Sequence, residues 1–265
     1  MKDLKSSAFY WPLCISLLLM FFQEFSGINC ILFYSPSILR ASAIGGKIIP
    51  ANGNNVEAIF DSIAESSKLS SVYICTTLLL FTIISCFLVD RYGRRKLLLS
   101  GSAAMFLSLL GIGVYVYEVP VNEMKMVNFI KSYSALPIAA FVLTLIFIAM
   151  FSLGWGPLPW LLMSELFPLK TRAVATGIVT FANWMFVFIT TILFKPIVKS
   201  GLHLSGAFFI FAGITLVGFV FTFLFVPETK GRPLEDVSEM FIRQQLLQVN
   251  IPWTRHDLYQ HPDDK

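Results

Sequence analysis

The sequence predicts an all-α integral membrane protein with six transmembrane helices, and three observations lead to this fold class. First, 56% of the 265 residues are hydrophobic and only 14% are charged, whereas soluble domains carry about 25% charged residues. Second, the mean hydropathy is +0.72 and the chain holds 26 phenylalanines, too many for a surface that faces water. Third, the apolar runs reach the ~20 residues that a helix needs to cross a bilayer.

The apolar runs divide the chain into a start, a bundle and a tail. Backbone groups in lipid must be satisfied within the segment, so helices are expected rather than the short alternating strands of a barrel. We predict a cytoplasmic start at 1–9, a six-helix bundle at 10–226 and a cytoplasmic tail at 227–265. The expected spans are about 10–39, 69–89, 97–117, 136–164, 173–198 and 204–226.

The distribution of lysine and arginine predicts the orientation of the bundle. Basic residues are concentrated before the first span, between spans two and three, between spans four and five, and after span six. Because cytoplasmic loops carry the excess of basic residues, both termini are expected in the cytoplasm. The net charge of +4 is spread over loops and gives no reason to expect a nucleic-acid partner.

Polar residues interrupt the first span in the stretch FFQEFSGINCILFYSPS, residues 21–37. Gln23, Asn29 and Tyr34 offer hydrogen-bonding groups to one region, and Gly27 allows a local bend. Amides and hydroxyls both donate and accept hydrogen bonds, as sugar hydroxyls do. The stretch therefore indicates a site for a neutral polyhydroxyl ligand, which aromatic rings would contact on its apolar faces.

The fourth span contains a second interruption. Gly156, Pro157 and Pro159 predict a bend or break, because proline lacks the backbone N–H and clashes with the preceding turn. Trp160 follows, and either presents its indole to a ligand or belongs to an interfacial aromatic belt. In the fifth span, Asn183 fits a ligand contact and a helix–helix hydrogen bond equally well.

Charged residues recur at the expected cytoplasmic ends of the spans. One interpretation is that these residues form cytoplasmic loops that obey the positive-inside rule. A second is that the acids beside the arginine cluster form ion pairs between helix ends. Such pairs hold one conformation of a two-state protein. The expected network comprises Asp90, Arg91, Arg94, Arg95, Glu165, Arg172, Glu228 and Arg232.

In this order, the motifs resemble those of the C-terminal half of a sugar porter of the major facilitator superfamily. The matching residues are Gln23 to Tyr34, the Arg91–Arg95 loop, Gly156 to Trp160, the Asn183–Trp184 pair and Pro227 to Gly231. The resemblance runs from about residue 10 to 232 and is closest to facilitators for glucose-type hexoses and for trehalose.

The resemblance implies facilitated diffusion of a hexose or trehalose across the plasma membrane by alternating access. It assigns the sugar contacts to Gln23, Asn29, Trp160 and Asn183, and a cytoplasmic latch to the loop charges. It also implies a partner, the N-terminal six-helix half that this chain does not contain. We expect no metal, no cofactor and no enzymatic activity, since no catalytic cluster is visible in the sequence.

Three departures from the family pattern bear on function. Glu24 replaces a glutamine of the sugar site, Phe33 replaces a tyrosine, and Leu78 stands where the family has asparagine. Burial in a span favours a neutral carboxyl group, so Glu24 either substitutes for glutamine, which we favour, or makes transport sensitive to protons. The alternatives to facilitated diffusion are a proton-coupled sugar symporter and a non-transporting sugar sensor or inactive fragment.

Overall fold

The computed structural model describes residues 7–32, 56–118, 135–198 and 203–231, and within these ranges the chain is helical without a strand. The predicted all-α membrane fold class is confirmed, because six helices are long and apolar enough to cross a membrane. These candidate spans are Phe9–Leu32, Ser71–Tyr92, Arg94–Glu118, Ile138–Leu166, Leu169–Ile197 and Leu204–Phe225. The expected end of the first span, and most of the expected start and tail, lie outside the described residues.

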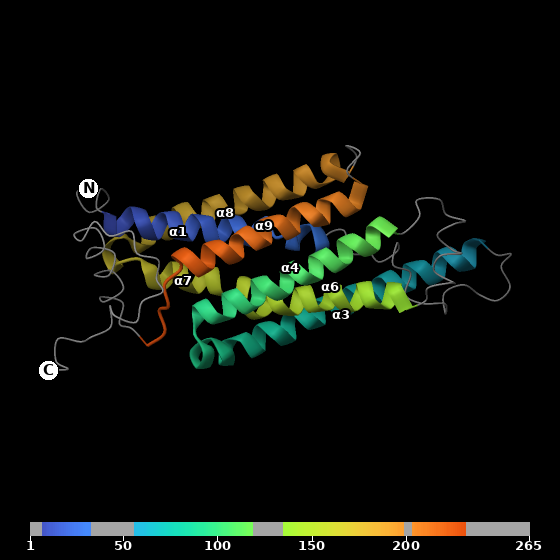
Figure 1. Cartoon of the computed structure of the whole chain (residues 1–265), viewed down its shortest axis with the longest axis horizontal. Helices are drawn as coiled ribbons and strands as arrows, with labels where there is room; N and C mark the ends of the chain where they lie inside the picture. The colour runs from blue at the N-terminus through green and yellow to red at the C-terminus, as the bar shows by residue number, and fades with distance from the viewer. Residues whose placement is uncertain (1–6, 33–55, 119–134, 199–202, 232–265) are drawn as a thin grey trace.

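The helices form two groups that pack side by side (Figure 1). One group holds α1, α8 and α9, and the other holds α3, α4 and α6. Helix α4 packs along both α9 and α6 and so joins the groups, while α1 packs along α8 and α7. The element bounds are α1 (Ser7–Glu24), α3 (Val56–Tyr92), α4 (Arg94–Glu118), α6 (Ala135–Met150), η2 (Phe151–Trp155), α7 (Leu158–Leu166), α8 (Leu169–Ile197) and α9 (His203–Phe225).

Four junctions lie at one end of the bundle. Figure 1 shows the start of α1, the α3–α4 turn, the α7–α8 junction and the end of α9 at this common end. Between one of these junctions and the next, the chain runs along the bundle twice and so returns to the same end. It brings the charged motifs of distant segments into one region.

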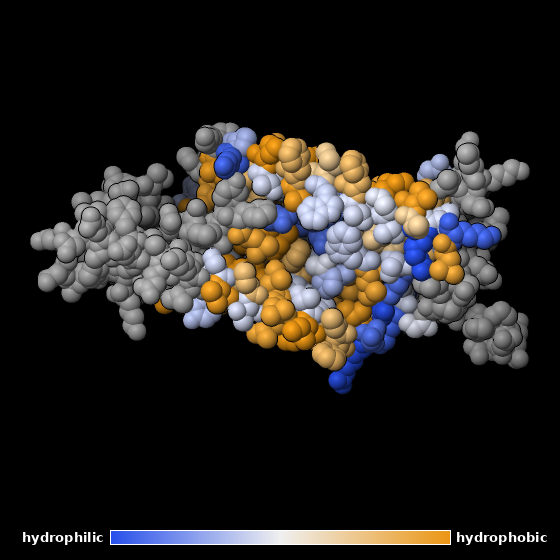
Figure 2. Space-filling model, turned by 180° about the vertical axis from the view of Figure 1, so that it is seen from behind, coloured by the Kyte–Doolittle hydropathy of each residue, from blue (hydrophilic) through white to orange (hydrophobic). Residues whose placement is uncertain are grey.

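The outer surface of the bundle is apolar where it would meet lipid. Hydrophobic residues cover much of the middle of the face in Figure 2, and hydrophilic residues gather toward one end. Large apolar side chains stay exposed, with Phe87 at 75% and Phe181 at 70% of their full accessible surface. A soluble domain would not leave such side chains in water, whereas a bilayer accommodates them.

The first span is broken at Gly27. Helix α1 ends at Glu24, a turn follows, and the chain is helical again from Ile28 to Leu32. Gly27 has φ +86°, a conformation that other residues rarely adopt. A Cβ at this position would also lie 2.4 Å from the Phe211 ring. The break therefore depends on glycine here.

The fourth span is broken between Phe151 and Pro157. The π-helical segment η2 precedes the prolines, and the Gly156 N–H donates to the Phe151 carbonyl at 2.7 Å. Because Pro157 has no N–H and its ring crowds the preceding turn, the wider π turn absorbs the mismatch before α7 begins with Pro157 as its N-cap. The interruption thus starts six residues before the first proline.

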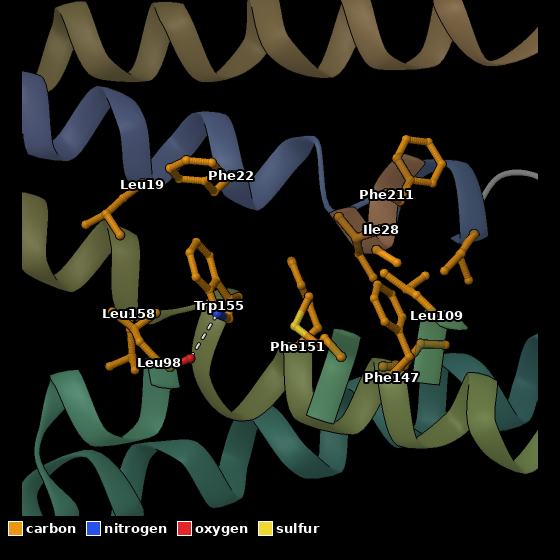
Figure 3. Packing of buried hydrophobic residues seen from close by; sticks show 14 of the residues in the cluster. Leu19, Phe22, Ile28, Leu98, Leu109, Phe147, Phe151, Trp155, Leu158 and Phe211 are labelled. Carbon is orange, nitrogen blue, oxygen red and sulfur yellow. Dashed lines mark hydrogen bonds between the residues drawn. The ribbon is translucent and has the colours of Figure 1, made fainter. Parts of the chain in front are cut away.

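The core between the two helix groups is filled by large apolar side chains (Figure 3). Trp155 is 2% exposed and lies between α1, at Leu19 and Phe22, and α4. Its Nε1–H donates to the Leu98 carbonyl at 3.1 Å. This bond satisfies the indole N–H in a site that water does not reach.

Candidate functional site

A cluster of buried polar side chains lies where α1 ends. Gln23 and Glu24 occupy the last turn of α1 and are 4% and 6% exposed. Asn183 reaches them from the middle of α8 and is 3% exposed. Asn29 follows the Gly27 turn and is half-buried. We call Gln23, Glu24, Asn29 and Asn183 the polar cluster.

Glu24 accepts hydrogen bonds through both carboxylate oxygens. The Nδ2 of Asn183 donates to its Oε1 at 2.9 Å, and the Nδ2 of Asn29 donates to its Oε2. Asn183 Nδ2 also lies 3.5 Å from the Oε1 of Gln23. Both oxygens of this carboxyl group thus serve as hydrogen-bond acceptors.

Gln23 connects the two helix breaks. Its Nε2 donates to the Gly156 carbonyl at 2.9 Å, across 133 positions of sequence. Gly156 is the residue just before Pro157, at the end of the π turn. One side chain of the first span is thus bonded to the broken backbone of the fourth.

Three aromatic rings lie beside the polar cluster. Phe21 stacks on Phe25 with ring centroids 4.4 Å apart, and Phe186 of α8 meets Phe21 edge-on at 5.6 Å. All three side chains are half-buried. The sequence interpretation missed them, although Phe21 stands three residues from Glu24 and Phe186 three residues from Asn183, a spacing that puts each pair on one helix face.

Trp160 lies on α7 against an apolar cluster built from α1, α7 and α8. This cluster includes Phe9, Met20 and Val179, and Trp160 is half-buried against it. Met20 also borders the polar cluster, because its Sδ lies 3.5 Å from Asn183 Nδ2. Tyr34, the remaining predicted contact, lies outside the described residues.

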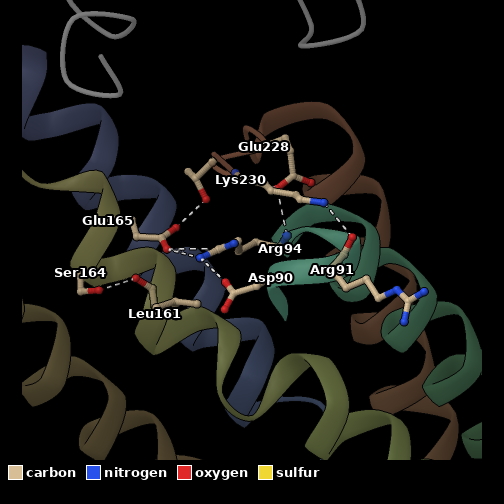
Figure 4. A network of polar contacts seen from close by, with 9 residues as sticks. Asp90, Arg91, Arg94, Leu161, Ser164, Glu165, Glu228 and Lys230 are labelled. Carbon is tan, nitrogen blue, oxygen red and sulfur yellow. Dashed lines mark hydrogen bonds and ion pairs between the residues drawn. The ribbon is translucent and has the colours of Figure 1, made fainter. Parts of the chain in front are cut away.

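A second constellation lies at the common end of the bundle, centred on Arg94 (Figure 4). Arg94 pairs with Glu165 through Nε at 3.2 Å and Nη2 at 3.0 Å. Its Nη2 also lies 3.3 Å from Asp90. The side chains of Arg94 and Glu165 are 13% and 16% exposed and that of Asp90 is 81% exposed. The Arg94–Glu165 pair, which joins α4 to α7, is therefore the better shielded one.

Glu228 caps α4 from the far end of the chain. Its carboxylate accepts the backbone N–H of Arg94 at 2.9 Å and of Arg95 at 3.2 Å. A negative charge at a helix N-terminus is stabilised by the unpaired N–H groups and the helix dipole. Gly93, at φ +89°, leaves the space, since a Cβ there would lie 2.7 Å from Glu228 Oε2.

The segment after α9 adds two further contacts. Thr229 Oγ1 donates to Glu165 Oε2 at 2.5 Å, and Lys230 Nζ donates to the Arg91 carbonyl at 2.7 Å. The sequence interpretation did not include Thr229. We call Asp90, Arg94, Glu165, Glu228 and Thr229 the charge latch.

Two predicted members of the network make other contacts. Arg172 donates through Nε and Nη2 to the Phe167 carbonyl, which holds the α7–α8 junction. Arg95 donates to the Phe223 carbonyl and lies over the Phe223 ring at 5.7 Å. Arg232 lies outside the described residues.

The fold and the two constellations define a class: a polytopic membrane protein whose broken spans surround buried polar side chains. Residues 1–241 match the family described as sugar (and other) transporter. The chain belongs to this family.

Relatives with curated descriptions agree with this membership. The chain is 36% identical over 239 residues to a facilitated trehalose transporter of Anopheles gambiae, covering 90% of this chain and 26% of that protein. It is 36% identical over 255 residues to solute carrier family 2, facilitated glucose transporter member 8, of Mus musculus, covering 90% and 47%. The chain thus spans less than half the length of these relatives.

Solved structures share the fold. A proton:xylose symporter of the major facilitator superfamily, XylE, bound to 6-bromo-6-deoxy-D-glucose, aligns with TM-score 0.66 and 24% identity. The alignment covers 86% of this chain and 42% of that one. The predicted resemblance to major facilitator sugar porters is confirmed.

Proposed function

We propose that this chain is the C-terminal half of a facilitated transporter that carries a hexose or trehalose by alternating access. The observation that carries the proposal is the polar cluster, where amide and carboxylate side chains of two spans meet beside two helix breaks. Broken helices at membrane depth are characteristic of substrate sites in transporters. Gln23, Glu24, Asn29 and Asn183 would hold the sugar, with Tyr34 and Trp160 as further contacts.

The charge latch supports the alternating-access part of the proposal. Arg94, Glu165 and Glu228 come from three separate segments, so their contacts exist only while α4, α7 and the segment after α9 stay together. Ion pairs of this kind favour one state of a two-state protein. The latch would close the cytoplasmic side, with both termini in the cytoplasm and the protein in the plasma membrane.

The partner would be an N-terminal six-helix half, since such transporters place the site between two halves. Uptake of labelled glucose and trehalose into proteoliposomes tests this, with the complete transporter compared with the chain alone. We expect saturable uptake by the complete transporter and none by the chain alone. Binding without uptake by the complete transporter would favour the sensor or inactive interpretation.

Proton-coupled symport is the second candidate, and Glu24 is the observation that favours it. A carboxylate inside a span is a common proton carrier. An imposed pH gradient separates the two candidates. Facilitated diffusion predicts that uptake stops when inside and outside concentrations are equal, whereas symport predicts accumulation beyond that point.

A further inference from the structure

Glu24 is a buried carboxylate held by uncharged groups. Its two hydrogen-bond donors, the amides of Asn29 and Asn183, satisfy lone pairs but neutralise no charge. In the part of the chain that the structure describes, the ion pairs are those of Arg94 with Asp90 and Glu165, and no lysine or arginine pairs with Glu24. A buried charge without a counter-charge is costly, so this carboxylate is suited to a positive charge from elsewhere.

The hydrogen bonds of Glu24 are those of an acceptor. A protonated carboxyl group must donate its O–H, but both oxygens of Glu24 face an amide N–H₂ donor. The oxygen of Gln23, Oε1, is a further acceptor in the cluster and lies 3.5 Å from Asn183 Nδ2. Glu24 therefore offers its remaining lone pairs to an incoming donor.

A ligand ammonium group fits these surroundings. A carboxylate has about four lone-pair positions, of which the two amides use two. Asn29 is half-buried, whereas Asn183 is 3% exposed, so Asn29 is the more accessible of the two donors. Phe21 and Phe25 stack on each other through one face each, and the ring faces that remain attract a cation as well as the C–H face of a pyranose.

We propose that Glu24 gives the sugar site a preference for protonated amino sugars over neutral hexoses. The inference rests on the proposed function, because it names the substrate class of that same site. The ammonium group would donate to Glu24 at the position that Asn29 Nδ2 now occupies or beside it. Gln23 and Asn183 would serve the hydroxyls of the same ring.

Competition for uptake of labelled glucose by the complete transporter tests the preference. The competitors are 2-amino-, 3-amino- and 6-amino-deoxyglucose, with N-acetylglucosamine as an uncharged control. A hydrogen bond to a charged group is roughly twice as strong as a neutral one, so at least one amine is expected to inhibit at a concentration about tenfold lower than glucose itself. If none of the three amines inhibits better than glucose, the inference is overturned.

Variants separate Glu24 from the rest of the site. The measured ratio is the inhibitory concentration of glucose divided by that of the amine. Glu24→Gln is expected to bring this ratio within about threefold of one. Glu24→Asp keeps the charge and is expected to retain a preference for the amine. Glu118→Gln is the matched control, since Glu118 is exposed at the end of α4 and its neutralisation leaves the ratio unchanged. A ratio that persists in Glu24→Gln overturns the inference. If that variant gives no uptake, the wild-type and Glu24→Asp ratios decide.

The failures of the two proposals are distinguishable. Glucose uptake without amine preference overturns only the assignment of Glu24. Absence of uptake of glucose and trehalose overturns the proposed function, and the substrate class falls with it.

Discussion

Replacing Glu228 by alanine is expected to lower the stability of the bundle. Glu228 accepts the first two N–H groups of α4, from Arg94 and Arg95, at 2.9 and 3.2 Å. It also accepts the Lys230 N–H at 3.2 Å. Loss of a helix-capping acceptor costs about 0.5–2 kcal/mol and loss of a favourable charge at a helix N-terminus about 0.3–1 kcal/mol. Because Glu228 is half-buried, water replaces part of the hydrogen bonding that the substitution removes. The expected decrease in the free energy of unfolding is therefore about 1–2 kcal/mol.

The measurement is the thermal unfolding of the purified chain in detergent. For a chain of this size, a change of about 1 kcal/mol moves Tm by about 2–4 °C, so Glu228→Ala is expected to lower Tm by about 3–6 °C. Glu228→Gln keeps one acceptor oxygen, and its Tm is expected to lie about halfway between those of the wild type and Glu228→Ala. Glu118→Ala, at an exposed carboxylate, is the control and should change Tm by about 1 °C or less. Equal Tm values for Glu228→Ala and Glu118→Ala would refute the capping argument.

Two further substitutions test the breaks and the core. Gly27→Ala should lower Tm by at least about 3 °C, because φ +86° costs a non-glycine residue about 1–2 kcal/mol and the new Cβ meets the Phe211 ring at 2.4 Å; an unchanged Tm would show that the turn relaxes freely. Trp155→Phe removes one donor from the buried Leu98 carbonyl, which also accepts from Ser102 Oγ at 2.8 Å, and should cost about 0.5–1.5 kcal/mol. The same change at Trp184, which is 65% exposed, serves as its control, and equal unfolding curves for the two variants would contradict the importance of the indole bond.

The sequence was sufficient for the fold class because the bilayer leaves few choices. A long apolar run must be helical in lipid, so composition and run length predict the spans without knowledge of their packing. The proline pair at 157 and 159 likewise predicts an interruption from covalent geometry alone. The π turn that precedes it was not predictable, since its position depends on how α4 and α3 pack against the η2 segment.

The site was predictable in residue type but less so in its contacts. Polar residues inside apolar runs stand out, and the structure brings Gln23, Glu24, Asn29 and Asn183 together. The hydrogen bond from Gln23 to a backbone carbonyl of another span has no sequence signal, because a carbonyl is present at every residue. For the same reason the sequence did not predict that Arg172 donates to the Phe167 carbonyl rather than to a carboxylate.

The single hydrogen bond between Gln23 and Gly156 makes the two helix breaks interdependent. The amide of Gln23 has one N–H₂ group and one oxygen, and the described contacts use the first for Gly156 and direct the second toward Asn183. A ligand hydroxyl that accepts from Gln23 must share its N–H₂ group with the Gly156 carbonyl or displace that carbonyl. A net hydrogen bond contributes about 0.5–1.5 kcal/mol, and a coupling of that size changes an affinity by about two- to tenfold. Ligand binding at the end of α1 is therefore linked to the conformation of the α6–α7 break through the side chain of Gln23. This linkage requires no further contact between the two spans.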